Sequence, residues 1–156
     1  MKNIIIYLIV LTSFACAKKE TTKEVVVGIW QKSPVMASGW VQSYTFFPDG
    51  KFIYRKSQGD QLDRELSSEG IFKISNDTLT LETQLLVKLE GGQIVNGPFD
   101  DKVIEGAKET QTLIKPATIE KFFLPKIELD ENFQKLKMEI GETTFWKFRD
   151  NPNEYE

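Results

Sequence analysis

VQSYTFFPDGKFIYRK, residues 41–56, is the stretch that decides the fold. Two aromatic-rich runs, 41–47 and 51–56, flank Pro48-Asp49-Gly50. A Pro-Asp-Gly sequence between such runs is a strong signal for a tight turn joining two antiparallel strands. The stretch therefore predicts a β-hairpin.

The same arrangement returns twice farther along the chain. Runs 68–74 and 78–83 flank a polar turn, and runs 135–140 and 143–149 flank Gly141-Glu142. Between residues 78 and 83, leucines alternate with Thr and Glu, which predicts a strand with one buried and one wet face. We expect further strands at 25–31, 85–90, 102–104 and 110–114, an irregular middle at 91–110, and a segment at 118–124 with helical as well as strand character.

Eight to ten short strands are expected in this chain, with no long amphipathic helix and no internal repeat of 20 to 50 residues. An open sheet of so many strands would expose unpaired edges, so closure of the sheet into a barrel is favoured. The predicted fold is all-β, a single antiparallel up-and-down β-barrel. It occupies residues 25–150 and is followed by a polar tail at 151–156.

The chain begins MKNIIIYLIVLTSFAC, with Lys2, an apolar run from 4 to 14, and Ala15 before Cys16. This order of a cationic start, an apolar run and a small residue predicts a secretory signal peptide at residues 1–15. The run is shorter than the roughly 20 residues that span a bilayer. Residues 16–24 are polar and charged, which predicts a solvated tether.

Ser13-Phe14-Ala15-Cys16 resembles a bacterial lipobox, although Leu and a small residue are commoner at its first two positions. The resemblance implies that Cys16 is lipidated and becomes the first residue of the mature chain. We then expect a lipid-anchored protein of the bacterial cell envelope. The outer membrane is favoured over the inner one because no Asp stands beside Cys16. The tether is a passive spacer, or its charges act as a sorting signal.

The amino-acid composition excludes most kinds of catalytic site. The chain has no histidine and one cysteine, so His general bases, His metal ligands and intramolecular disulfides are excluded. No Gly-x-Ser-x-Gly elbow or phosphate-binding glycine loop is present, and Asp60, Asp63 and Glu65 fall in a charged stretch expected to be a loop. Neither Asp100-Asp101 nor Asp130-Glu131 forms a calcium-loop pattern. We expect no catalytic residue, no metal site and no cofactor, and the net charge of −3 argues against nucleic-acid binding.

Gly28-Ile29-Trp30 is similar to the Gly-x-Trp element that opens lipocalins, and Arg149 matches the basic residue near their last strand. Together with the hairpin pattern, these residues resemble small lipocalin-like lipoproteins of the Bacteroidota. The resemblance implies that Trp30 plugs one end of the barrel and that Arg149 covers it through a cation–π contact. The alternative is that Trp30 is an ordinary core aromatic.

A barrel of eight strands either fills with side chains or holds one small apolar ligand. The predicted ligand-binding residues are Phe46, Phe52, Tyr54, Phe72 and Trp146. Other inward candidates are Leu79, Leu81, Leu85, Val87, Met138 and Phe148. Binding of a small hydrophobic molecule is the favoured function. The alternative is a structural or protein-interaction lipoprotein with a filled barrel, whose partner in the envelope contacts the loops predicted at 57–67 and 91–108, with Ile94, Val95 and Phe99 as candidate contacts.

Overall fold

The computed structural model describes residues 23–37, 39–98, 101–124 and 127–154. The predicted signal peptide, Cys16 and most of the tether lie outside the described residues, as does Phe99. In these residues, one short helix precedes nine strands, and their bounds are α1 Lys23–Val26, β1 Gly28–Gln31, β2 Ser43–Phe46, β3 Lys51–Arg55, β4 Glu65–Ser75, β5 Thr78–Asn96, β6 Lys102–Phe123, β7 Glu128–Asp130, β8 Lys135–Ile140 and β9 Thr143–Arg149. Within the described ranges, no helix is long and apolar enough to span a membrane.

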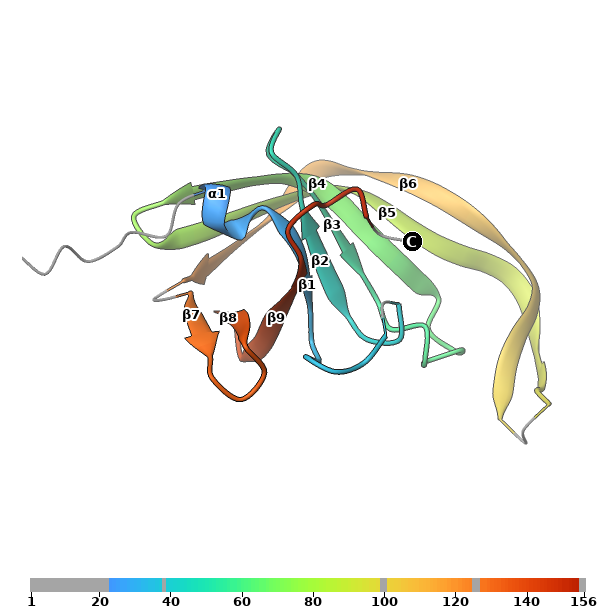
Figure 1. Cartoon of the computed structure of the whole chain (residues 1–156). Coiled ribbons are helices and arrows are strands. Elements are labelled where there is room, and N and C mark those ends of the chain that lie inside the picture. Colours follow the sequence, from blue (N-terminus) through green and yellow to red (C-terminus); the bar gives the residue numbers. More distant parts are fainter. Residues whose placement is uncertain (1–22, 38, 99–100, 125–126, 155–156) are drawn as a thin grey trace, which may run out of the picture.

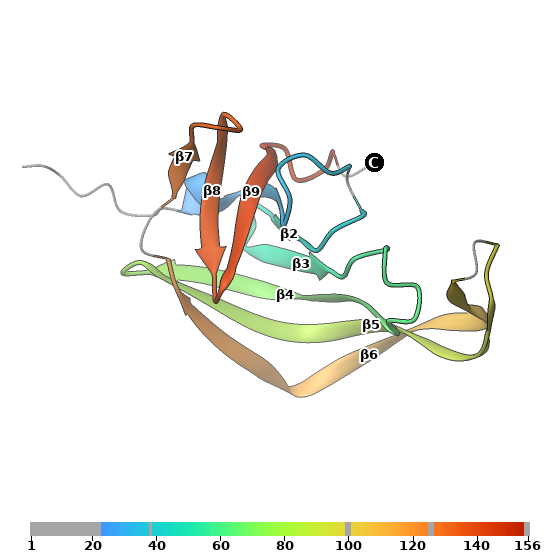
Figure 2. The same ribbon diagram turned by 90° about the horizontal axis from the view of Figure 1, so that it is seen from below.

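All nine strands belong to one antiparallel sheet in the order β6-β5-β4-β3-β2-β1-β9-β8-β7. Every strand pairs with its neighbours in the chain except that β6 and β7 do not pair with each other, and the first and last strands, β1 and β9, also pair. β6 and β7 form the two edges, so hydrogen bonds do not close the sheet. The all-β, antiparallel part of the predicted fold is confirmed. The sheet folds over so that β7–β9 lie across β4–β6 (Figures 1 and 2).

The hairpins predicted from their turns are present. β2 and β3 pair across Pro48-Asp49-Gly50, and β8 and β9 across Gly141-Glu142. In the β4–β5 turn, Asn76 and Asp77 have φ of 49° and 59°. Asn and Asp tolerate this left-handed backbone better than most side chains, which explains their place in a two-residue turn.

The prediction of an irregular middle was wrong. β5 and β6 run for 19 and 22 residues and pair from Thr78 and Phe123 out to Asn96 and Lys102. Their distal halves form a two-stranded arm, made of the described residues within 88–110, that extends beyond the rest of the sheet (Figure 1). Gly91, Gly92 and Gly106 take positive φ within the arm, so glycines that resemble strand breakers instead bend the ribbon. The region predicted as a contact loop is therefore this arm.

β6 is interrupted once. Thr83 pairs with Thr118 and Leu85 with Leu113, so residues 114–117, including Pro116, bulge opposite Gln84. Proline has no N–H to donate and is confined to edges and bulges of sheets. The bulge bends β6, which helps the sheet to curl.

The core lies between the two halves of the folded sheet. Its buried members are Val26, Trp30, Phe46, Phe52, Phe72, Leu79, Leu81, Leu124, Met138, Ile140 and Phe145. The inward positions predicted on β2 to β5 and at Met138 are thus largely right, with Leu85 as an exception. Leu85 pairs with Leu113 and lines a groove on the outer surface of the sheet.

The predicted inward face of the last strand was wrong by one residue. Phe145 is buried in the core, whereas Trp146 faces the other side of β9. Trp146 donates its Nε1–H to Asp130 Oδ2 at 2.9 Å and meets Phe133 edge-on. Because β9 carries aromatics at both 145 and 146, hydrophobicity alone does not identify which of them points inward.

Trp30 is fully buried, and its Nε1–H donates to the Val26 carbonyl oxygen at 2.7 Å. The cation over its ring is Lys147, whose Nζ lies 5.6 Å from the ring centroid, in place of the expected Arg149. A register shift between β1 and β9 makes Lys147 the cross-strand partner of Trp30. Arg149 pairs with Ile29 and packs on Phe148 at 4.5 Å.

Candidate binding cleft on the concave face

A half-open cleft of about 370 Å³ lies on the concave face of the sheet, beside the filled core. Strands β2 to β6 supply its walls. Its lining residues are Tyr44, Phe52, Tyr54, Lys56, Glu65, Ser67, Ser68, Leu81, Thr83, Leu86, Ile114, Thr118 and Glu120. Pockets that bind small molecules start at roughly this volume and combine apolar walls with a few polar groups.

The β2–β3 hairpin sets the centre of the cleft. Its register places Tyr44 directly opposite Tyr54, with ring centroids 4.6 Å apart. Tyr44 also stacks on Phe46 and meets the edge of Phe145, so core aromatics hold its ring in place. Directly opposite residues on one face of an antiparallel pair are the closest side-chain neighbours in a sheet, which is why the two phenols meet.

The two phenols stay protonated at neutral pH. Burial raises the pKa of Tyr44, and the charges of Tyr54 and Glu120 raise it further. Burial also raises the pKa of Tyr54, to which the carboxylates of Asp63 and Glu65 add while Lys56 opposes them. Neither hydroxyl makes a hydrogen bond to another described residue. Each phenol therefore keeps an O–H donor and an acceptor for a molecule in the cleft.

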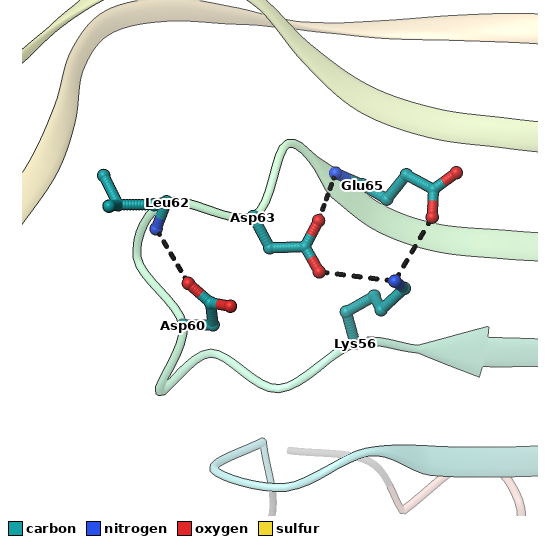
Figure 3. A network of polar contacts seen from close by, with 5 residues as sticks. All are labelled: Lys56, Asp60, Leu62, Asp63 and Glu65. Carbon is teal, nitrogen blue, oxygen red and sulfur yellow. Dashed lines mark hydrogen bonds and ion pairs between the residues drawn. The ribbon is translucent and has the colours of Figure 1, made fainter.

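Lys56 and Glu65, which both line the cleft, belong to a charged network (Figure 3). Lys56 Nζ lies 3.3 Å from both Asp63 Oδ2 and Glu65 Oε2, and the Glu65 N–H donates to Asp63 Oδ1 at 3.0 Å. Burial lowers the pKa of Lys56, but its hydrogen bonds to Glu65 and Asp63 outweigh this effect and raise the pKa overall. The ammonium group stays charged and fixes the loop that enters β4.

The predicted ligand residues separate into three groups. Phe52 and Tyr54 line the cleft. Phe46 and Phe72 pack edge-to-face in the core, with ring centroids 4.9 Å apart. Trp146 lies across the molecule beside Asp130, whose pKa is lowered by the Trp146 hydrogen bond.

Sequence reasoning missed Tyr44, Thr83 and Glu120 as cleft residues. Tyr44 had a usable signal, because counting outward from the turn at 48–50 places it opposite Tyr54. Glu120 had none, since its inward direction follows from its pairing with Leu81 on β5, which is distant in the sequence.

The cleft combines apolar surfaces with groups that can form hydrogen bonds. Apolar ring faces stand next to hydroxyl groups of Tyr, Ser and Thr, with a carboxylate from Glu120 at the far wall. Within the described part of the chain, no three His, Cys, Asp or Glu side chains are placed to hold a metal ion. The sequence matches no protein-family model, no curated protein and no solved structure.

Proposed function

We propose that this protein is a lipid-anchored, non-enzymatic protein of the bacterial cell envelope that binds one small amphipathic molecule on the concave face of a lipocalin-like, barrel-shaped sheet. One observation carries the binding proposal. Two neutral phenols, Tyr44 and Tyr54, lie on an apolar wall in a cleft of about 370 Å³, and their hydroxyls are free of described protein partners. The ligand class follows from this pairing: an apolar ring or chain that carries a polar group able to reach the phenols.

The anchor is proposed from the sequence. The signal-like segment at 1–15 is followed directly by Cys16, the only cysteine, so lipidation would hold the domain at a membrane. Cys16→Ser should release the protein into the soluble fraction of a bacterial lysate. Continued membrane association of this variant, through an uncleaved apolar segment, would contradict the lipoprotein proposal.

Native mass spectrometry tests the ligand proposal. The protein would be purified gently from a bacterial envelope, and a denatured sample would serve as the control. A small-molecule mass that disappears on denaturation is the expected result. The double variant Tyr44→Phe/Tyr54→Phe should lower the occupied fraction at least severalfold, because it removes both hydroxyls and leaves the rings. Phe133→Ala, at an exposed site outside the cleft, is the matched control and should leave occupancy unchanged.

A second candidate is an interaction protein whose barrel is filled. It is favoured by the core itself, because Trp30, Phe46 and Phe72 occupy the interior next to the cleft. The arm at 88–110 would then contact an envelope protein, since binding residues are often carried by segments that extend from a rigid scaffold. A clean apo mass in the same experiment would favour this candidate.

A further inference from the structure

The charges around the cleft on the concave face are uneven. Among the described residues that line it, Lys56 carries the only positive charge, and Glu65 and Glu120 are the carboxylates. The Lys56 ammonium lies 3.3 Å from carboxylate oxygens of both Glu65 and Asp63. These three side chains together keep a net negative charge, so Lys56 offers little attraction to an anionic ligand.

Glu120 is the carboxylate of the cleft that has no counterion in the described part of the chain. It pairs with Leu81 on β5, and directly opposite residues of an antiparallel pair lie on the same face of the sheet. Leu81 is buried in the core, so Glu120 is on the concave side, at the edge of the cleft. It makes no ion pair or hydrogen bond with another described residue. Its charge is close enough to Tyr44 to raise the pKa of that phenol.

The acceptors of the cleft suit a group that only donates hydrogen bonds. The hydroxyl oxygens of Tyr44 and Tyr54 can each accept a hydrogen bond, and the Glu120 carboxylate accepts without donating. A primary ammonium group has three N–H donors, no acceptor and a positive charge. Hydrogen bonds between an ammonium group and a carboxylate are stronger than those between neutral groups. The two phenols and Glu120 therefore match an ammonium group in both hydrogen bonding and charge.

The aromatic rings of the cleft favour a cation as well. The face of an aromatic ring carries partial negative charge and attracts a cation within about 6 Å of its centroid. Lys147 takes this place over the buried Trp30 ring, 5.6 Å from the centroid. No described cation lies over the rings of Phe52 and Tyr54, which line the cleft. These rings are therefore left to attract a cation that the ligand brings.

An apolar wall continues from the phenols across the sheet. Tyr54 pairs with Ser68, and Ser68 pairs with Leu86, so the three side chains form one row over β3, β4 and β5. Ile114, in the bulge of β6, lines the cleft next to this row. A molecule with its charge at the phenols can therefore place an apolar chain or ring against Leu86 and Ile114.

We propose that the ligand of this cleft is an amphipathic ammonium ion, an alkyl or aryl amine in its protonated form. The ammonium group binds between the Glu120 carboxylate and the hydroxyls of Tyr44 and Tyr54, and the apolar part lies against Leu86 and Ile114. The inference rests on the proposed function and names the ligand class that the same cleft selects. Anionic amphiphiles are disfavoured, because a negative head group at the phenols would meet the unpaired charge of Glu120.

Three probes that share one apolar chain test the preference for a charged head group. Octylammonium, octanol and octanoate carry a positive, a neutral and a negative head group at pH 7. Isothermal titration calorimetry, below the micelle-forming concentration of each probe, gives the three dissociation constants. The protein is the chain from residue 16 onward with Cys16→Ser, which keeps every described residue and needs no detergent. Salt at 0.1 M largely screens charges more than about 10 Å away, so the constants report the charges of the cleft.

We expect octylammonium to bind at least fivefold more tightly than octanol, and octanoate to bind more weakly than octanol. Glu120→Gln should weaken the binding of octylammonium at least fivefold and leave that of octanol within twofold. Glu120→Asp keeps the charge and should keep the order of the three probes. Glu105→Gln is the matched control, because Glu105 is an exposed carboxylate on the same strand that lines none of the clefts. It should leave all three constants unchanged.

Octylammonium that binds no more tightly than octanol would overturn the inference. An equal effect of Glu120→Gln and Glu105→Gln would also overturn it, because the preference would then come from the net charge of the protein. If octanol or octanoate binds as tightly as octylammonium and Tyr44→Phe/Tyr54→Phe abolishes this binding, the proposed function stands and only the ammonium ligand is refuted. Binding of none of the three probes would refute both the ammonium ligand and the binding function.

Discussion

Tyr44 and Tyr54 face each other across the β2–β3 hairpin with ring centroids 4.6 Å apart, and both phenols have a raised pKa. A phenol with a raised pKa in the folded state favours the fold while it stays protonated. Its contribution is complete below the unfolded pKa of about 10 and is lost as the pH rises through the folded pKa. This pair therefore links stability to alkaline pH.

Tyr44→Phe should flatten the loss of stability above pH 10, because the variant has no proton to lose at this position. Urea unfolding between pH 8 and pH 11 would measure the effect. Thr144→Val, a removal of a hydroxyl on β9 that lines none of the clefts described, is the control and should leave the slope unchanged. If the stability of Tyr44→Phe fell with pH as steeply as that of the wild type, this would contradict the raised pKa of Tyr44 as the cause.

Trp30→Ala should destabilise the protein by about 3–5 kcal/mol, the usual cost of removing a large buried aromatic side chain. Trp30 is fully buried and its indole N–H is bonded to Val26, whereas Trp40 is 55% exposed. Trp40→Ala is therefore the matched control, with an expected cost below about 1 kcal/mol. Chemical denaturation measures the free energy of unfolding of both variants. Similar losses of stability would contradict a larger contribution of Trp30 to the core.

Gly70→Ala should cost about 1–3 kcal/mol or more, since the new methyl group would overlap the backbone of Glu82 on β5. The neighbouring atoms belong to a central strand and have little room to move. Gly59→Ala is the control, because the nearest atom to its Cβ is the Ser57 hydroxyl at 3.2 Å in an exposed loop. Thermal unfolding would show a lowered Tm for Gly70→Ala alone.

Lys56→Met should loosen the loop at 57–64 and change global stability by less than about 1 kcal/mol, as expected for a half-exposed ion pair. Loss of the ammonium group leaves Asp63 and Glu65 close together without a cation. Amide hydrogen exchange in this loop should become faster, while exchange in β5 stays unchanged. Lys51→Met, which breaks the single exposed pair with Asp49, should leave the loop unaffected.

Local signals predicted the hairpins well. Pro48-Asp49-Gly50 and Gly141-Glu142 specify turns on their own, so the strands beside them begin and end close to the predicted residues. The arm at 88–110 was missed because its glycines also occur in loops. Only the pairing of β5 with β6 shows that they bend a continuous ribbon.

The register between strands that are far apart in the sequence could not be predicted from local patterns. The shift between β1 and β9 places Lys147 over Trp30, and no local pattern reveals such a shift. The inward-facing residues of β9 were predicted wrongly because Phe145 and Trp146 are adjacent and of similar hydrophobicity. In the candidate site, Phe52 and Tyr54 were found because the strong hairpin signal fixes their direction, whereas the direction of Glu120 follows from its long-range pairing with Leu81 on β5.

Pro116 has a consequence for contacts between copies of the protein. The outer side of β6 has no hydrogen-bonded neighbour among the described strands, and a free edge of 22 residues is a template for aggregation. The bulge at 114–117 divides this edge into two shorter pieces that bend away from each other, and proline offers no N–H to an incoming strand. Neighbouring copies thus meet a broken edge, which disfavours the growth of intermolecular sheets at high protein concentration.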